Sequence, residues 1–402
     1  MKAVIKPSKA EGVIMAPPSK SMAHRYLICA ALAEGESIIS NISYSEDVLA
    51  TLDCIRALGA EVIQSEEHVS IIGKGISAGG ILRFSCRECG STLRFMVPIA
   101  MMREEESILT GSETLLTRPM SVYEEIATSQ DLMYVKEGSE IHVKGRLSAG
   151  GYWVKGNISS QFISGLMFAL PLLEEDSTIN LIPPVDSRSY IDLTVKALLR
   201  FGVEVKWVDD TTLFVKGGQK YQPADVTVEG DFSNAAFMEA FNTIGGQVTT
   251  NGLDMTSAQG DRVYFDYFAR LMEGRACLDI SNCPDLGPIL FVVAAANYGG
   301  DFTGTRRLAI KESDRGRVMC EELAKFGIEC SQEEDSIHIG CGDIKAPDQI
   351  LHGHNDHRIV MSLATLLTLT GGEVDDAEAV RKSFPDYFTR IGRLGVDVQL
   401  IN

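Results

Sequence analysis

The stretch RFGVEV at 200–205 recurs, with few changes, as ALGAEV at 57–62, KFGIEC at 325–330 and RLGVDV at 393–398. Each copy predicts a helix that ends at glycine, which suits the left-handed position after a helix, and then a short strand. Weaker copies are YVKEG at 134–138 and MEGRACL at 272–278. Most copies continue through an acidic turn into a second strand that ends in glycine, as in EEHVSIIGKG and DTTLFVKGG, which predicts a hairpin. An internal repeat therefore decides the fold.

Six helices rich in small apolar residues begin at polar loops. Their starts are Ser19, Gly90, Ser159, Asp231, Pro284 and Asn355, separated by 71, 69, 72, 53 and 71 positions. Helices that are apolar on all sides are expected to be buried. A strand and an amphipathic helix lie between a buried helix and the hairpin. The predicted unit is thus a buried helix, a strand, an outer helix and a hairpin, about 70 residues long and present six times.

The sixth unit is truncated, because the chain stops after LGVDVQLIN at 394–402, where other units form a second strand. We expect the N-terminal segment to supply that strand. The sequence predicts an α/β (α+β) fold of two similar lobes, each made of three repeats around buried helices. One lobe comprises 19–229 and the other 1–18 plus 230–402. Two such lobes imply a cleft that can close on a ligand and hold the active site.

Composition excludes several classes of function. The 402 residues are 45% hydrophobic and 23% charged, which is typical of a globular protein. A net charge of −18 argues against nucleic acid or an anionic membrane as a partner. The apolar run near 289–297 is too short to span a membrane, and the N-terminus lacks the apolar core of a signal peptide. Nine scattered cysteines suggest reduced thiols, so we expect a cytoplasmic protein.

Positive and hydroxyl side chains gather where helices begin, which is where free N–H groups attract anions. Three carboxylates, Asp285, Glu312 and Asp314, accompany them and could act as bases. A single serine at such a place is usually a helix cap, and a single lysine is usually solvated. The pattern across six units instead indicates a site for several phosphate or carboxylate groups. Its members are Lys20, Ser21, Arg25, Gly90, Ser91, Thr92, Arg94, Arg118, Ser159, Ser160, Gln161, Ser187, Arg188, Lys311, Arg315, Arg317, His357, Arg358 and Lys382.

Competing motifs are weak. The glycines of 73–80 form neither G-x-G-x-x-G nor a phosphate-binding Walker loop, and a hairpin turn explains them better. The pair in CREC at 86–89 has no second pair at zinc spacing, and the histidines of 352–357 lack the spacing of HExxH. No G-x-S-x-G supports acyl chemistry. We therefore expect no metal.

Nine motifs resemble those of the EPSP synthase (3-phosphoshikimate 1-carboxyvinyltransferase) family, in the same order between residues 17 and 388. They are PPSKSMAHR, GSTLR, LLTRPM, SSQF, SYID, PD, KESDR, NDHR and KSFPDYF. The resemblance implies the enolpyruvyl transferase fold, with three β-α-β-α-β-β units in each domain, and no cofactor. It also implies transfer of the enolpyruvyl group of phosphoenolpyruvate to the 5-hydroxyl of shikimate-3-phosphate, with release of phosphate, in aromatic amino-acid biosynthesis.

The resemblance also implies roles for individual residues. Asp285 is the implied base for the 5-hydroxyl, and Glu312 is the implied acid toward the methylene carbon, with Lys20 sharing proton transfer. The shikimate-3-phosphate side would use Lys20, Ser21, Arg25, Ser159, Ser160, Gln161, Ser187, Asp285 and Lys311. The phosphoenolpyruvate side would use Lys20, Gly90, Arg118, Gln161, Arg315, Arg358 and Lys382.

Two positions depart from the family pattern. Glu88 stands where many relatives have asparagine, and its carboxylate would either repel phosphoenolpyruvate or pair with a nearby arginine. Arg307 falls where an asparagine often contacts shikimate-3-phosphate. Gly90 is kept and leaves room for phosphoenolpyruvate, so we predict that glyphosate competes with it. The measurement is the glyphosate inhibition constant at increasing phosphoenolpyruvate, and a constant that does not respond would contradict the prediction.

Two other functions stay open at this point. The related enolpyruvyl transferase that acts on UDP-N-acetylglucosamine shares the repeated fold, but it typically has a Lys-Asn pair where this chain has Lys20-Ser21, and a loop cysteine that GSETLLTRP at 111–119 lacks. A two-lobed anion-binding protein without catalysis would not need Asp285 and Glu312. A phosphate-release assay separates the three. The repeats can satisfy one another within one chain, so we expect a monomer.

Overall fold

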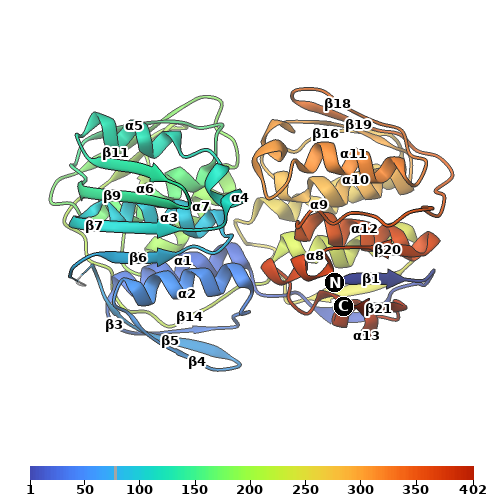
Figure 1. Ribbon diagram of the computed structural model, residues 1–402, viewed down its shortest axis with the longest axis horizontal. Coiled ribbons are helices and arrows are strands. Elements are labelled where there is room, and N and C mark those ends of the chain that lie inside the picture. The colour runs from blue at the N-terminus through green and yellow to red at the C-terminus, as the bar shows by residue number, and fades with distance from the viewer. Residues whose placement is uncertain (77–78) are drawn as a thin grey trace. The chain divides into compact units, whose positions relative to one another are not determined.

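The computed structural model describes residues 1–76 and 79–402. Contacts divide the chain into two compact units. We call Pro18–Glu229 the inner unit and Met1–Pro17 with Gly230–Asn402 the terminal unit, because the latter holds both chain ends (Figure 1).

Three helices form the centre of the inner unit: α1 (Lys20–Leu32), α3 (Gly90–Ala100) and α6 (Ser160–Ala169), which continues into η1 (Leu170–Leu172). Nearly all of their residues are buried, as the small apolar composition predicts. The outer helices are α2 (Glu46–Ala57), α4 (Glu113–Thr117), α5 (Ser121–Ser129) and α7 (Arg188–Arg200).

The described part of the inner unit has three sheets of four strands, each with the same order and a parallel first pair. The first is β14 (Val226–Thr227), β3 (Glu34–Ser40), β5 (His68–Lys74) and β4 (Glu61–Gln64). The second is β6 (Leu82–Ser85), β7 (Met102–Thr110), β9 (Glu140–Arg146) and β8 (Met133–Glu137). The third is β10 (Gly151–Lys155), β11 (Ser177–Ile182), β13 (Thr212–Val215) and β12 (Val205–Trp207). Because β14 follows the third repeat and pairs with the first sheet, the unit closes on itself.

The terminal unit repeats this plan. Its buried helices are α8 (Phe232–Glu239), which continues into η2 (Ala240–Ile244), α10 (Gly287–Ala296) and α12 (His357–Thr370). Its outer helices are α9 (Tyr264–Glu273), α11 (Arg315–Ala324) and α13 (Tyr387–Arg393). Short 3-10 turns are η3 (Gly260–Val263), η4 (Pro284–Leu286), η5 (Arg306–Ile310) and η6 (Ala377–Lys382).

One sheet of the terminal unit has the same order as those above: β16 (Ala276–Asp279), β17 (Gly300–Thr303), β19 (Ser336–Ile339) and β18 (Cys330–Gln332). In a second sheet, β1 (Lys2–Ile5) lies between β20 (Gly372–Val374) and β21 (Val398–Ile401). The N-terminal strand therefore completes the truncated sixth unit, as predicted.

The fourth unit differs from the prediction, because it lacks the hairpin. Its sheet is a parallel pair of β15 (Gln247–Asn251) and β2 (Glu11–Met15), which explains the spacing of 53 rather than about 70 positions. Side chains from η2 and α8 bind the other edge of β15. The Asn242 amide accepts from the Val248 N–H at 2.6 Å and donates to the Val248 carbonyl at 2.8 Å. Glu239 accepts from the Thr250 N–H at 3.0 Å. These bonds take the place of a neighbouring strand.

The glycine pattern is correct at four positions, wrong at one and half right at Gly274, where α9 ends as predicted but φ is 170° and therefore extended. The glycines after α2, α7, α11 and α13 all have positive φ, with φ 74° at Gly202 and 81° at Gly327. The copy at 134–138 is different, because α5 ends at Ser129 and Gly138 lies in the turn between β8 and β9. Spacing alone could not separate a helix end from a hairpin turn, since both favour glycine with positive φ.

No helix among the described residues is both long and apolar enough to span a bilayer.

Candidate active site

The three buried helices of the inner unit begin with side-chain caps. Ser19 accepts from the Met22 N–H at 3.4 Å, and Ser159 accepts from the Gln161 N–H at 3.3 Å. The cap of α3 is the thiol of Cys89, which accepts from the Thr92 N–H at 3.4 Å. The other first-turn N–H groups of these helices supply the partial positive charge that an anion needs.

Lys20 opens α1 and forms an ion pair with Asp47, with 2.7 Å between Nζ and Oδ2. Only 16% of the lysine side chain and 10% of the aspartate side chain are exposed. Sequence analysis missed Asp47, which lies in the first turn of α2 and reads as one of two ordinary acidic residues after the Ser45 cap.

Gly90 lies beside Arg118, although 28 residues separate them. A Cβ atom at Gly90 would come within 2.8 Å of the Arg118 Nη1 atom, so this close approach requires glycine. Gln161 joins the same group from α6, because its amide donates to Ser91 at 2.8 Å and accepts from Arg94 at 2.7 Å. Three of the predicted phosphoenolpyruvate residues therefore gather with Arg94, which was only a general candidate.

Arg25 is held firmly and is 3% exposed. Its Nε donates to Thr194 at 2.8 Å, its Nη2 donates to the Tyr190 carbonyl at 2.9 Å, and its guanidinium lies 5.3 Å from the centre of the Phe95 ring. Burial lowers the pKa of Arg25 to about 10, which leaves it charged at neutral pH. Arg25 thus carries positive charge in a fixed orientation between α1 and α7.

The predicted serines also lie at helix starts. Ser159 and Ser160 are buried at the start of α6, and Ser21 is in the first turn of α1. Ser187 precedes α7, is fully buried and has φ 55°, a left-handed conformation that is uncommon for serine and frequent at functional sites. Arg188 instead stacks 4.0 Å from the Trp207 ring centre and is not part of this group.

The terminal unit brings its predicted residues around one carboxylate, Asp285. Its Oδ1 accepts from Lys311 at 3.1 Å and from Arg315 at 2.9 Å, and its Oδ2 accepts from Arg358 at 3.1 Å. Burial by itself raises the pKa of Asp285. The three cations outweigh that effect and hold the pKa well below its usual range, so Asp285 is ionised here.

Arg315 connects this carboxylate to two others. It is 1% exposed, donates to Glu312 at 2.6 Å and donates to Asp356 at 2.8 Å. Asp356 is fully buried and caps α12 through the Arg358 N–H at 2.9 Å. Sequence analysis missed Asp356, although it is the D of the NDHR motif. An aspartate at a helix start is explained by capping alone, so its position in the sequence gave no sign of the ion pair with Arg315.

The remaining candidates divide into two groups. Lys382 donates to the Asn355 carbonyl at 2.7 Å, which places it at the start of α12. Burial lowers the pKa of Lys311; the Asp285 carboxylate opposes that shift, and the charges of Arg307 and Arg315 add to it. Arg317 points away, because its side chain is 57% exposed and pairs with Glu321 at 2.6 Å.

The sequence motifs considered for metal do not form a ligand set. Cys86 lies 3.9 Å from Cys54, His352 pairs with Asp375 at 2.7 Å, and His354 contacts Glu322 at 3.3 Å. Within 1–76 and 79–402, Cys89 of the CREC pair lies instead with His24 and Asp47, and the possible ligand atoms of these three residues are within 4.8 Å of one another.

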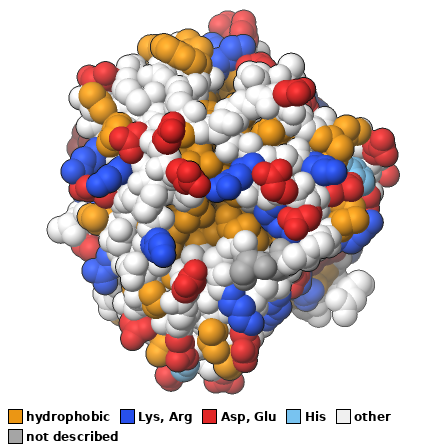
Figure 2. Space-filling model, turned by 90° about the vertical axis from the view of Figure 1, so that its left-hand side faces the viewer, with side chains coloured by type: hydrophobic (Ala, Val, Ile, Leu, Met, Phe, Trp, Pro, Cys, Tyr) orange, Lys and Arg blue, Asp and Glu red, His pale blue; other side chains and the backbone are white. Residues whose placement is uncertain are grey.

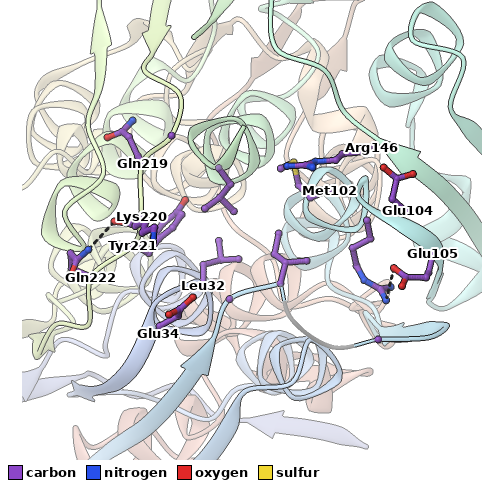
Figure 3. A pocket seen from close by; sticks show the side chains of 16 residues that line it. Leu32, Glu34, Met102, Glu104, Glu105, Arg146, Gln219, Lys220, Tyr221 and Gln222 are labelled. Carbon is purple, nitrogen blue, oxygen red and sulfur yellow. Dashed lines mark hydrogen bonds and ion pairs between the residues drawn. The ribbon is translucent and has the colours of Figure 1, made fainter. Parts of the chain in front are cut away.

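A cavity of about 800 Å³ opens in the inner unit, away from these residues. Figure 2 shows it as a hollow with hydrophobic side chains at its base. Leu32 at the end of α1, Met102 at the start of β7 and Arg146 at the end of β9 line it (Figure 3). Leu172 of η1 also lines it. The thirteen residues of α1 rise roughly 18 Å. The cavity is therefore separated from Lys20 by about the length of that helix.

Comparisons with known proteins agree with the resemblance. The model of the family described as EPSP synthase (3-phosphoshikimate 1-carboxyvinyltransferase) matches residues 4–276 and 267–391. A 3-phosphoshikimate 1-carboxyvinyltransferase of Clostridium perfringens is 39% identical over 98% of both chains. One of Clostridium kluyveri is 37% identical over 98% of this chain and 97% of the relative.

The chain belongs to the EPSP synthase family. This chain is thus a transferase that moves the enolpyruvyl group of phosphoenolpyruvate to shikimate-3-phosphate. The EPSP synthase of Acinetobacter baumannii has the same fold, with a TM-score of 0.81, 23% identity and full coverage of both chains. So does the enolpyruvyl transferase NikO of Streptomyces tendae, with a TM-score of 0.79, 13% identity and coverage of 99% and 98%. The predicted fold class is confirmed.

Proposed function

We propose that the clusters of the two units bind the two substrates together, in a cleft that closes over them. The supporting observation is the Asp285 cluster, where one ionised carboxylate lies within hydrogen-bond distance of Lys311, Arg315 and Arg358. Such a site attracts anions and still holds a carboxylate for proton transfer. Closure would exclude water from the activated enol ether.

We assign shikimate-3-phosphate to the helix starts of the inner unit and to Asp285. Ser159, Ser160 and Ser187 would hold its phosphate, because they combine hydroxyl donors with helix N-termini. Gln161 would lie near the ring. The other residues assigned to this substrate are Lys20, Ser21, Arg25 and Lys311.

We assign phosphoenolpyruvate to cations of both units. Arg118 lies against Gly90 and would meet the substrate there, beside Gln161. Arginine suits this task because its planar fork binds carboxylate and phosphate in two places. The other residues assigned to this substrate are Lys20, Arg315, Arg358 and Lys382.

In this mechanism Asp285 removes the proton from the 5-hydroxyl. In the free protein its pKa is low, which makes it a weak base. The phosphate and carboxylate groups of the bound substrates would neutralise Arg315 and Arg358, and the pKa of Asp285 would then rise. Substrate binding itself would therefore activate the base.

Glu312 is proposed to deliver the proton to the methylene carbon, with Lys20 sharing the transfer. Protonation makes C2 electrophilic, the 5-hydroxyl adds to give a tetrahedral intermediate, and elimination of phosphate restores the alkene. Because Glu312 accepts from Arg315 at 2.6 Å in the free protein, it would take up a proton from solvent when phosphoenolpyruvate engages Arg315. A Glu312→Gln variant keeps the shape but has no acidic proton. It should bind both substrates and lose turnover, whereas normal turnover would remove Glu312 from the mechanism.

We also propose that the protein acts as a monomer in the cytoplasm. All nine cysteines are free thiols, which suits a reducing compartment. Light scattering during size-exclusion chromatography should give the mass of one chain, and twice that mass would refute the monomer.

A further inference from the structure

Three side chains of kinds that bind metals meet near Lys20. His24 comes from α1, Asp47 from the first turn of α2, and Cys89 from the cap position of α3. All three are buried, and their possible ligand atoms lie within 4.8 Å of one another. Residues from three separate helices therefore converge on one point.

The imidazole of His24 is oriented as in a metal site. Its Nδ1 is hydrogen-bonded to Thr51 Oγ1 at 2.7 Å, which leaves Nε2 facing the Cys89 sulfur at 3.9 Å. Thr51 is itself hydrogen-bonded to Thr92 at 2.7 Å. A hydrogen bond at the non-ligating nitrogen is the usual way in which a protein orients a histidine ligand. When Nδ1 carries the ring proton and donates it to Thr51, Nε2 holds the lone pair that a metal ligand needs.

The distance between the sulfur and the imidazole nitrogen is close to that of tetrahedral coordination. With zinc bonds of about 2.3 Å to sulfur and about 2.0 Å to nitrogen, the two ligand atoms lie about 3.5 Å apart. The observed separation of 3.9 Å between Cys89 Sγ and His24 Nε2 closes with a small side-chain shift. A thiolate and a carboxylate also balance two positive charges, which a buried divalent ion requires.

We propose that His24, Asp47 and Cys89 form a binding site for a zinc-class transition-metal ion. The ligands are His24 Nε2, the Cys89 thiolate and an Asp47 carboxylate oxygen, with a fourth position for water. When the ion binds, the sulfur–metal bond forms and the thiol proton of Cys89 leaves to solvent. A cysteine thiol is protonated at neutral pH, so each ion that binds the thiolate releases one proton. Thiolate and imidazole ligands favour zinc-class ions over magnesium or calcium.

A bound ion would inhibit the enzyme. This inhibition rests on the proposed function, whereas the metal site itself does not. Asp47 now pairs with Lys20 at 2.7 Å. A metal ion on Asp47 breaks that pair and repels the lysine ammonium, which we assign to both substrates. Zinc inhibition should therefore be relieved by chelator and by substrate.

Cobalt is the direct probe of the site, because a thiolate ligand gives Co²⁺ a charge-transfer absorption band. The full chain is titrated with Co²⁺ while absorbance and proton release are recorded. Cys89→Ser keeps an oxygen acceptor for the α3 cap but removes the thiolate. Cys86→Ser is the matched control, since Cys86 is equally buried and pairs with Cys54 instead. His24→Gln tests the second ligand and replaces Cys89→Ser if that variant fails to fold.

We expect one high-affinity Co²⁺ per chain, displaced by Zn²⁺, with the band intact in Cys86→Ser. Cys89→Ser should lose the band, and both ligand variants should bind at least about tenfold more weakly. Absence of binding in the wild-type chain, or a band that survives in Cys89→Ser, would overturn the site. Because binding is read without substrate, this failure is distinct from a failure of the proposed mechanism. Binding without zinc inhibition would overturn the inhibitory role.

Discussion

At the residue scale, the site depends on buried ion pairs whose partners are far apart in sequence. The sequence motifs identified Lys20 and Arg315, but they did not identify Asp47 and Asp356 as the carboxylates that pair with them. Helix-start aspartates are common as caps, so their sequence positions carry no signal of a second partner. Only the fold shows that Asp356 meets Arg315 at 2.8 Å and that Asp47 meets Lys20 at 2.7 Å.

Replacing Asp285 by asparagine should remove the base and preserve the shape of the side chain. We expect kcat to fall by about 10² to 10⁴, the usual contribution of a general base, while both substrates still bind. Steady-state kinetics together with calorimetric titration of shikimate-3-phosphate measure the two effects separately. Arg317→Gln, an exposed position outside the cluster, serves as the control. Turnover near that of the wild type would rule out Asp285 as the base.

The same Asp285→Asn substitution should change how acid destabilises the protein. The folded-state pKa of Asp285 is depressed, so its stabilising effect is present above the unfolded-state pKa of about 4 and is lost as pH falls through the folded-state value. Between pH 7 and pH 3, the free energy of unfolding should therefore decrease less in Asp285→Asn than in the wild type. Urea unfolding at several pH values measures this, and parallel pH curves for the two proteins would contradict it.

Substituting Gly90 by alanine should displace Arg118. The added methyl group would lie 2.8 Å from Nη1, so the guanidinium must move by a few tenths of an ångström or more. Because we assign Arg118 to phosphoenolpyruvate, the KM for phosphoenolpyruvate should rise several-fold while the KM for shikimate-3-phosphate changes little. Equal increases in both KM values would indicate a general disturbance of α3 instead.

At the element scale, the sequence predicts most of the architecture because the physical causes are local. Apolar composition predicted the buried helices, and glycines with positive φ marked the ends of α2, α7, α11 and α13. The missing hairpin of the fourth unit was visible only as a shorter spacing. The hydrogen bonds of Asn242 and Glu239 to the free edge of β15 could not be predicted, since neither residue belongs to a recognised edge motif.

Asn242→Ala should therefore weaken the terminal unit. It removes both hydrogen bonds to Val248 and leaves that strand edge unpaired, a loss of about 1 to 3 kcal/mol in the free energy of unfolding. Asn180→Ala is a suitable control, because Asn180 is equally half-buried and its amide donates to the Thr178 side chain rather than to a strand backbone. Chemical denaturation of both variants is the measurement. Equal losses of stability in the two variants would show that the hydrogen bonds of Asn242 to the edge of β15 do not stabilise the unit.

At the scale of the whole molecule, two units with the same internal plan each present helix N-termini with buried cations. The inner unit supplies mainly hydroxyls, amides and Arg118, whereas the terminal unit supplies the carboxylates of Asp285 and Glu312. In our account, binding groups come from both units and proton transfer comes mainly from the terminal unit. Neither unit should be active alone.

Phosphate release from phosphoenolpyruvate, assayed in buffer with a chelator, tests the enolpyruvyl transfer itself. Phosphate should appear only when shikimate-3-phosphate is present, at a rate that saturates with both substrates. UDP-N-acetylglucosamine should not substitute for shikimate-3-phosphate. Phosphate release that does not depend on shikimate-3-phosphate, or no release although both substrates bind, would contradict enolpyruvyl transfer to shikimate-3-phosphate.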